Sequence, residues 1–188
     1  MSNNEGEGRP ENLSIAVIGA SGDLAVKKIF PALLALYCQK LLPSGFRVFG
    51  FARTALTTDE FRNRISKHLT CRYTASCDVE IGEFLSRCFY LPGKYDSRES
   101  FLDFYKLMSS HENTHGTNRI FYLAIPSSVF LETARAMAGA GLVICGPGPL
   151  WSRVVIEKPF GKDRQSSDIL TRELAGVFSE EQTFRIDH

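Results

Sequence analysis

The sequence predicts an α/β fold in which helices cover both faces of a doubly wound parallel sheet. Short apolar segments alternate with longer segments of helical periodicity along almost the whole chain, and this alternation is typical of right-handed strand–helix–strand units. The strand-like segments are apolar on both faces, as a sheet between two layers of helices requires. With 188 residues, of which 44% are apolar, the chain is long enough for one sizeable core and a single domain.

Each strand and helix follows from a local pattern. Apolar, β-branched and aromatic segments predict strands at residues 13–19, 46–52, 88–93, 119–126, 152–161 and 183–187. Helical spacing of apolar residues predicts helices at 24–40, 57–69, 97–110, 127–138 and 163–178. Thr57 and Glu60 form a capping-box pattern at the start of the second helix, and Pro31 should kink or divide the first.

Charge and hydropathy exclude several classes of protein. A formal net charge of +1 gives no broad basic field for nucleic acid or an anionic membrane. No run approaches the roughly 18 apolar residues that a membrane span needs. Residues 1–12 are polar and slightly acidic, and we interpret them as a disordered lead-in rather than a secretory signal or transit peptide. A cytoplasmic protein is therefore expected.

The cysteines predict neither disulfides nor a metal site. The chain has five, an odd number scattered along the sequence, which favours reduced thiols. Cys71 and Cys77 have only His68 as a nearby imidazole, and no close pair with zinc-site spacing is present. We expect no metal.

The turn after the first strand predicts a nucleotide site. Gly19, Gly22 and Ala25 have the GxxGxxA spacing of a dinucleotide-binding turn between a strand and a helix. Gly19 can adopt angles that a Cβ forbids, Gly22 lets a diphosphate approach the main chain, and Ala25 lets helix and strand pack closely. Asp23 would repel a phosphate and should point away toward a basic or backbone group. A tight turn with a small packing contact is the alternative, and a P-loop is excluded because no Gly-Lys-Ser/Thr follows.

The end of the second strand favours NADP over NAD. NAD-binding domains carry an acidic residue near this strand end, whereas here Arg53 occupies it and no acid follows before Asp59. A guanidinium forms bidentate, charge-assisted bonds with a 2′-phosphate, and Lys28 would add a second cation. The alternative for Arg53 is a solvated cation at a strand end.

Taken together, several motifs resemble a known family. The segments GASGDLAVKKIFPAL, FGFART, NRIFYLAIP, VVIEKPFG and FRIDH resemble, in order and spacing, the amino-terminal coenzyme domain of the glucose-6-phosphate dehydrogenase family. The likeness covers residues 13–188 and implies a Rossmann-like domain. It also implies oxidation of glucose 6-phosphate at C1 to the lactone, with hydride transfer to NADP, in the pentose phosphate pathway.

The resemblance also implies roles for individual residues. The coenzyme turn would consist of Gly19, Ala20, Ser21, Gly22, Asp23, Leu24 and Ala25. Arg53 would meet the 2′-phosphate, and Tyr122 would lie along the coenzyme. Lys158 would touch both coenzyme and sugar phosphate, while Asp187 and His188 would open the substrate motif, with His188 on the substrate phosphate.

One departure from the family pattern is large. The chain ends within the RIDH motif, and the family's carboxyl-terminal α+β domain, with its catalytic histidine and subunit interface, is absent from residues 1–188. We therefore expect a fragment that binds NADP, contains no catalytic residue and is inactive alone. The parent would be a homodimer or tetramer.

Two other readings compete with this one. Tyr90 and Lys94 have the YxxxK spacing of short-chain reductases, but Pro92 and Gly93 between them prevent a shared helical face. A non-catalytic NADP-binding or sensing module stays open as the alternative, because fold does not fix function.

Overall fold

The sheet has six parallel strands in the order β3-β2-β1-β4-β5-β6, which is the strand order of a dinucleotide-binding fold. The computed structural model describes residues 12–70, 77–112, 116–144, 148–157 and 164–186. The strands are β1 (Leu13–Ile18), β2 (Arg47–Ala52), β3 (Cys88–Pro92), β4 (Asn118–Leu123), β5 (Ser152–Glu157) and β6 (Thr183–Ile186). The predicted fold class is confirmed.

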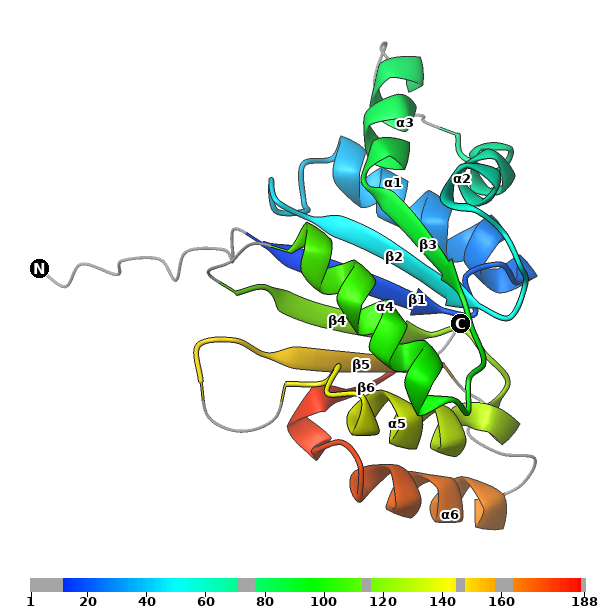
Figure 1. The fold of residues 1–188 in the computed structure, drawn as a ribbon, viewed down its shortest axis with the longest axis vertical. Helices are drawn as coiled ribbons and strands as arrows, with labels where there is room; N and C mark the ends of the chain where they lie inside the picture. The colour runs from blue at the N-terminus through cyan, green and yellow to red at the C-terminus, as the bar shows by residue number, and fades with distance from the viewer. Residues whose placement is uncertain (1–11, 71–76, 113–115, 145–147, 158–163, 187–188) are drawn as a thin grey trace, which may run out of the picture.

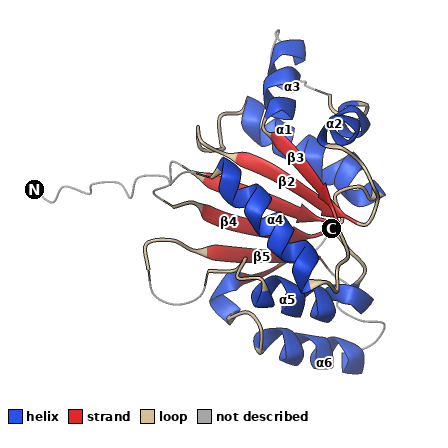
Figure 2. Ribbon diagram, in the orientation of Figure 1, coloured by secondary structure: helices blue, strands red, loops and turns tan. Residues whose placement is uncertain are grey.

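Helices lie on both sides of the single layer of strands (Figures 1 and 2). A π-helical turn (Ala25–Ile29) leads into α1 (Phe30–Cys38), which packs with α2 (Thr58–Ser66) and α3 (Cys77–Ser86) over β1 to β3. On the other face lie α4 (Arg98–His111), α5 (Phe130–Gly139) and α6 (Arg164–Ala175). Two 3-10 turns, Ser127–Val129 and Glu180–Gln182, precede α5 and β6. Among the described helices, none is long and apolar enough to cross a membrane.

Aromatic side chains fill the core on each face. On the α4 face, Phe51 stacks on Phe101 with their ring centroids 4.5 Å apart, and both rings are fully buried. On the α1 face, Phe30 meets Phe61 edge-on at 5.3 Å. Burial of such large rings is the main stabilising contribution in a sheet sandwiched between helices.

Three local features differ from the sequence prediction. Helix α3 was not predicted, because only Phe84 of its residues is buried and the apolar periodicity is weak. The first helix begins with a π turn, in which the Phe30 N–H bonds to the Ala25 carbonyl just before Pro31. The extra residue of this turn stands where we expected a kink. Strand β4 ends at Leu123, three residues before the predicted Pro126, which instead caps the 3-10 turn that begins at Ser127.

A buried ion pair stabilises the sheet at the amino-terminal ends of its strands. Arg119 of β4 donates to both carboxylate oxygens of Glu112, at 2.9 and 2.6 Å, and both side chains are less than one-tenth exposed. Arg119 also donates to the carbonyl of Leu142. The contacts join the end of α4 to β4 on the side opposite the carboxyl ends of the strands.

Several predictions concern residues outside the ranges that the structure describes. The lead-in apart from Asn12, the predicted strand residues 158–161, Cys71, Cys145 and His115 lie outside the described residues. Cys88 forms no disulfide, and its buried thiol donates to the Phe84 carbonyl. No group of three or more potential metal ligands lies together among the described side chains.

Candidate functional site

The glycine turn lies at the carboxyl end of β1, the strand that pairs with β2 on one side and with β4 on the other. Gly19 has φ +92°, and a Cβ there would lie 2.2 Å from the carbonyl oxygen of Ala124. The Gly19 N–H bonds to the Phe51 carbonyl at 2.7 Å. The requirement for glycine at position 19 therefore comes from the neighbouring strand ends as well as from the backbone angle.

Gly22 has different surroundings. A Cβ at this position would find only the Gly19 carbonyl oxygen within 4 Å, at 3.2 Å, and the residue is exposed. The position is thus open on its outer side, and the helix that begins at residue 23 presents its amino end there. A free helix amino end beside a missing side chain suits a diphosphate, because its N–H groups and partial positive charge face outward.

The other turn residues divide into inward and outward groups. Ala20 and Ala25 are fully buried, and Leu24 is half-buried against the core. Asp23 points away to Lys27, with its carboxylate 2.8 Å from the ammonium, as the sequence suggested. The hydrogen bond and charge of Lys27 hold the pKa of Asp23 below its ordinary value. Lys28 is exposed on the same π turn.

Arg53 follows β2 directly and is exposed. Its guanidinium lies 5.3 Å from the centroid of the Tyr95 ring.

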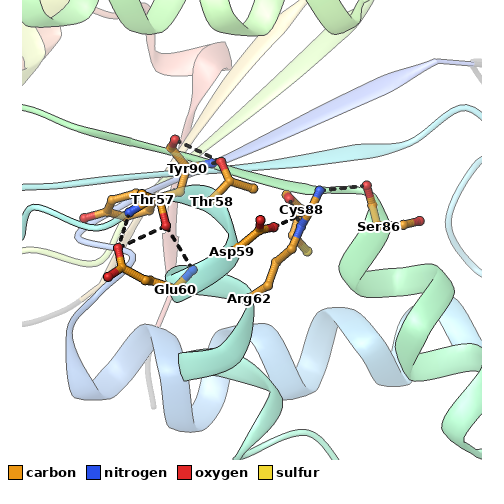
Figure 3. Close-up of polar contacts among 8 residues, drawn as sticks. All are labelled: Thr57, Thr58, Asp59, Glu60, Arg62, Ser86, Cys88 and Tyr90. Carbon is orange, nitrogen blue, oxygen red and sulfur yellow. Dashed lines mark hydrogen bonds and ion pairs between the residues drawn. The ribbon is translucent and has the colours of Figure 1, made fainter.

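The capping box of α2 forms as predicted: the Thr57 hydroxyl accepts from the Glu60 N–H, and the Glu60 carboxylate accepts from the Thr57 N–H (Figure 3). Glu60 is thereby turned toward the helix end, and none of the ion pairs found among the described residues involves Arg53.

The hydroxyl of Ser21 connects this strand end to the glycine turn. It lies 2.8 Å from the hydroxyl of Thr54, so a hydrogen bond joins the turn after β1 to the residue after Arg53. The two candidate regions predicted separately from the sequence, the glycine turn and the Arg53 end of β2, are therefore adjacent.

Tyr122 lies on β4, and its hydroxyl donates to the carboxylate of Glu157 at the end of β5. Burial, together with this bond, raises the pKa of Tyr122 above its ordinary value. The pair places a polar group at the carboxyl ends of the two strands beyond the glycine turn. Lys158, Asp187 and His188 lie outside the described residues.

Sequence reasoning missed several residues of this edge. The sequence pattern gave no reason to single out Thr54, Glu157 or the central strand glycine Gly50. It drew attention to Tyr90 only through the YxxxK spacing. The structure places Tyr90 within β3 and Lys94 beyond its end, so that pair shares no helix, as expected. An available signal was Gly50, because glycine inside an apolar strand often marks a close approach by another group.

Comparisons with known proteins agree with this geometry. The family model "Glucose-6-phosphate dehydrogenase, NAD binding domain" matches residues 16–188. A chloroplastic glucose-6-phosphate 1-dehydrogenase from Nicotiana tabacum is 48% identical over 94% of this chain and 29% of its own length. A cytoplasmic one from Arabidopsis thaliana is 41% identical over 94% of this chain and 35% of its own length. The chain thus spans about a third of these curated relatives.

Solved structures show the same likeness. A glucose-6-phosphate dehydrogenase in complex with glucose 6-phosphate superposes with a TM-score of 0.86 at 37% identity, over 95% of this chain and 37% of that one. The enzyme from Mycobacterium avium gives 0.77 at 25% identity, over 93% of this chain and 36% of that one. With the glycine turn at the carboxyl end of β1 and the strand order of a dinucleotide-binding sheet, these matches establish that the chain belongs to the glucose-6-phosphate dehydrogenase family and forms its nicotinamide-coenzyme-binding domain.

Proposed function

We propose that this domain binds NADP, and that the protein to which it belongs oxidises glucose 6-phosphate at C1 to the lactone, in the pentose phosphate pathway. The observation that carries the proposal is the open outer side of Gly22 at the amino end of a helix, next to an exposed arginine at the end of β2. The diphosphate would lie against residues 19–25, and the adenosine 2′-phosphate against Arg53, with Lys28 as a second cation.

The remaining coenzyme and substrate roles follow from the chain order of the family motifs. Tyr122 would lie along the coenzyme, and its bond to Glu157 would hold its ring in place. Lys158 would contact coenzyme and substrate, and Asp187 and His188 the sugar phosphate. The relatives support this substrate, since one of the solved ones is a complex with glucose 6-phosphate.

Arg53→Ala should remove most of the preference for NADP. Loss of a charge-assisted pair costs about 1.5–3 kcal/mol, which is roughly ten- to hundredfold in affinity. NAD carries no 2′-phosphate, so its affinity should stay nearly unchanged. Isothermal titration calorimetry with both coenzymes measures the difference, with Arg172→Ala on α6 as a control for the loss of a surface charge. Equal losses for NADP and NAD would contradict the assignment of Arg53.

The chain of 188 residues is expected to bind NADP without reducing it. General-base help is worth about 10²–10⁴ in rate, and orientation of the sugar contributes further. Of the described histidines, His111 packs on Phe89 at the amino edge and His68 follows α2, so neither lies at the ends of β4 and β5. Absorbance of reduced coenzyme, with both substrates saturating, measures turnover. If the purified 188-residue chain, free of host enzyme, reduced NADP, a general base would have to lie within these residues.

Two properties of the whole protein belong to the same proposal. We propose a cytoplasmic homodimer or tetramer, although the relatives include chloroplastic and cytoplasmic enzymes. Fluorescence of the tagged full-length protein tests the compartment, and light scattering tests the assembly. A non-catalytic NADP-sensing module is the alternative, and it predicts that the full-length protein also fails to oxidise glucose 6-phosphate.

A further inference from the structure

We propose that Tyr90, a buried residue of β3, positions Arg53 and thereby sets how strongly the domain prefers a coenzyme with a 2′-phosphate. The inference rests on the proposed function, because it concerns the group that Arg53 would bind. Tyr90 itself would not touch the coenzyme. It would act through the backbone beside Arg53, chiefly the Thr54 carbonyl.

The first observation is where the Tyr90 hydroxyl donates. Its oxygen lies 2.7 Å from the carbonyl oxygen of Thr54 and 3.4 Å from that of Ala52. These are the carbonyls immediately after and before Arg53. Because a phenol has a single proton, the 2.7 Å bond to Thr54 is the main donation and the 3.4 Å approach to Ala52 is weak. The phenol therefore holds the backbone just after the arginine, and the direction in which Arg53 leaves the strand end depends on it.

The second observation is that the backbone of the same tyrosine fixes the far end of the loop. The Thr58 hydroxyl accepts from the Tyr90 N–H at 3.2 Å and lies 3.3 Å from the Tyr90 carbonyl, to which it donates (Figure 3). The connection from Arg53 to α2 is therefore tied to one residue of β3 at each end. Through the Thr54 hydroxyl, it is also tied to Ser21 of the glycine turn.

The third observation is that the fold makes room for this ring. Tyr90 is only 4% exposed, and its ring stacks on Phe61 with the centroids 4.7 Å apart. A Cβ at Gly50 would lie 3.0 Å from the Tyr90 ring, so the ring occupies the space that a side chain on β2 would fill. The hydroxyl is thus held in one direction, toward the carbonyls beside Arg53.

The chemistry of the hydroxyl fits a permanent donor. Burial is the main cause that raises the pKa of Tyr90 to about 12, so the phenol keeps its proton through the neutral range. A buried tyrosine hydroxyl needs a partner, and its short bond is to the Thr54 carbonyl beside Arg53, while the Ser21 side chain of the glycine turn also interacts with it. A core tyrosine needed only for packing would function equally well as phenylalanine, and this difference makes the proposal testable.

The test compares NADP and NAD binding by calorimetry in the wild-type chain and in Tyr90→Phe, Arg53→Ala and the double variant. Tyr90→Phe keeps the ring and removes the donor. We expect it to weaken NADP binding about three- to tenfold, with NAD affinity and melting temperature little changed. In the Arg53→Ala background the same change should leave the NADP/NAD ratio unaltered, because its effect passes through Arg53.

Tyr37→Phe is the matched control. Its hydroxyl donates to Glu83 at 2.5 Å, and its ring lies against Phe46 before the start of β2, at the opposite end of that strand from Arg53. It should leave the ratio unchanged. If Tyr90→Phe is too unstable to measure, Thr58→Val, which removes the second tie while Tyr90 remains, should shift the ratio in the same direction.

The outcomes separate the two claims. If Arg53→Ala lowers the ratio but Tyr90→Phe and Thr58→Val do not, the role of Tyr90 is wrong and the proposed function stands. An additive effect of Tyr90→Phe in the Arg53→Ala background would also overturn it, since the tyrosine would then act without the arginine. If Arg53→Ala leaves the ratio unchanged, the assignment of the 2′-phosphate to Arg53 fails, and the inference about Tyr90 fails with it.

Discussion

Replacement of Gly22 by valine (Gly22→Val) is expected to abolish coenzyme binding while the domain stays folded. The outer side of Gly22 is open, and the nearest atom to a Cβ there is the Gly19 carbonyl oxygen at 3.2 Å. The added methyl groups would fill the space that a diphosphate needs to reach the N–H groups of the turn. We expect affinity for NADP and NAD to fall by at least about 100-fold, the equivalent of about 2.7 kcal/mol, as measured by calorimetry.

The control for this variant is Gly82→Val. Gly82 lies on α3, and a Cβ there meets no atom within 4 Å, so coenzyme affinity should not change. Melting curves of both variants report whether the fold is kept. A Gly22→Val protein that binds NADP normally would mean that the diphosphate lies elsewhere on the sheet.

Replacement of Gly19 by alanine (Gly19→Ala) should instead destabilise the fold itself. The residue has φ +92°, and its Cβ would be 2.2 Å from the Ala124 carbonyl oxygen and 2.9 Å from a side-chain carbon of Ile125. The backbone just after β1 or β4 must shift to relieve these contacts, and the 2.7 Å bond from the Gly19 N–H to the Phe51 carbonyl opposes such a shift. We expect the free energy of unfolding to fall by about 3 kcal/mol or more, as measured by urea denaturation.

The variant Gly141→Ala distinguishes the loss of stability caused by a steric clash from the loss caused by the backbone angle. Gly141 has φ +71°, but a Cβ there meets no atom within 4 Å. Its loss of stability should be about 1–2 kcal/mol, the cost of the left-handed conformation alone. If Gly19→Ala costs no more than Gly141→Ala, the contact with Ala124 does not explain why position 19 needs glycine.

The sequence predicted those parts of the fold that depend on local chemistry. Strand and helix alternation, the capping box at Thr57 and the orientation of Asp23 toward a basic group all follow from neighbouring residues, and the structure confirms them. Helix α3 was missed because Phe84 is its single fully buried residue, and its other apolar residues are at most partly buried. Local periodicity carries little information when so little of a helix is buried.

The adjacency of site residues could not be predicted in the same way. Ser21 and Thr54 meet because β1 and β2 are neighbours, and Tyr90 reaches the carbonyls beside Arg53 because β3 pairs with β2 and Gly50 leaves room. Each contact depends on the register of two strands far apart in the chain. The sequence identified Arg53 from its position at a strand end, but nothing local shows which residue holds that end in place.

The strand order has a consequence for how the chain folds as it is synthesised. Ser14 of β1 pairs with Arg47 of β2 on one side, and Leu13 pairs with Asn118 of β4 on the other. At translation rates of about 5–20 residues per second, β4 is made roughly 5 to 20 seconds after β1. One edge of β1, including the backbone just before the glycine turn, has no partner strand during this interval. The nascent chain is therefore expected to depend most on chaperones before residue 123 has left the ribosome.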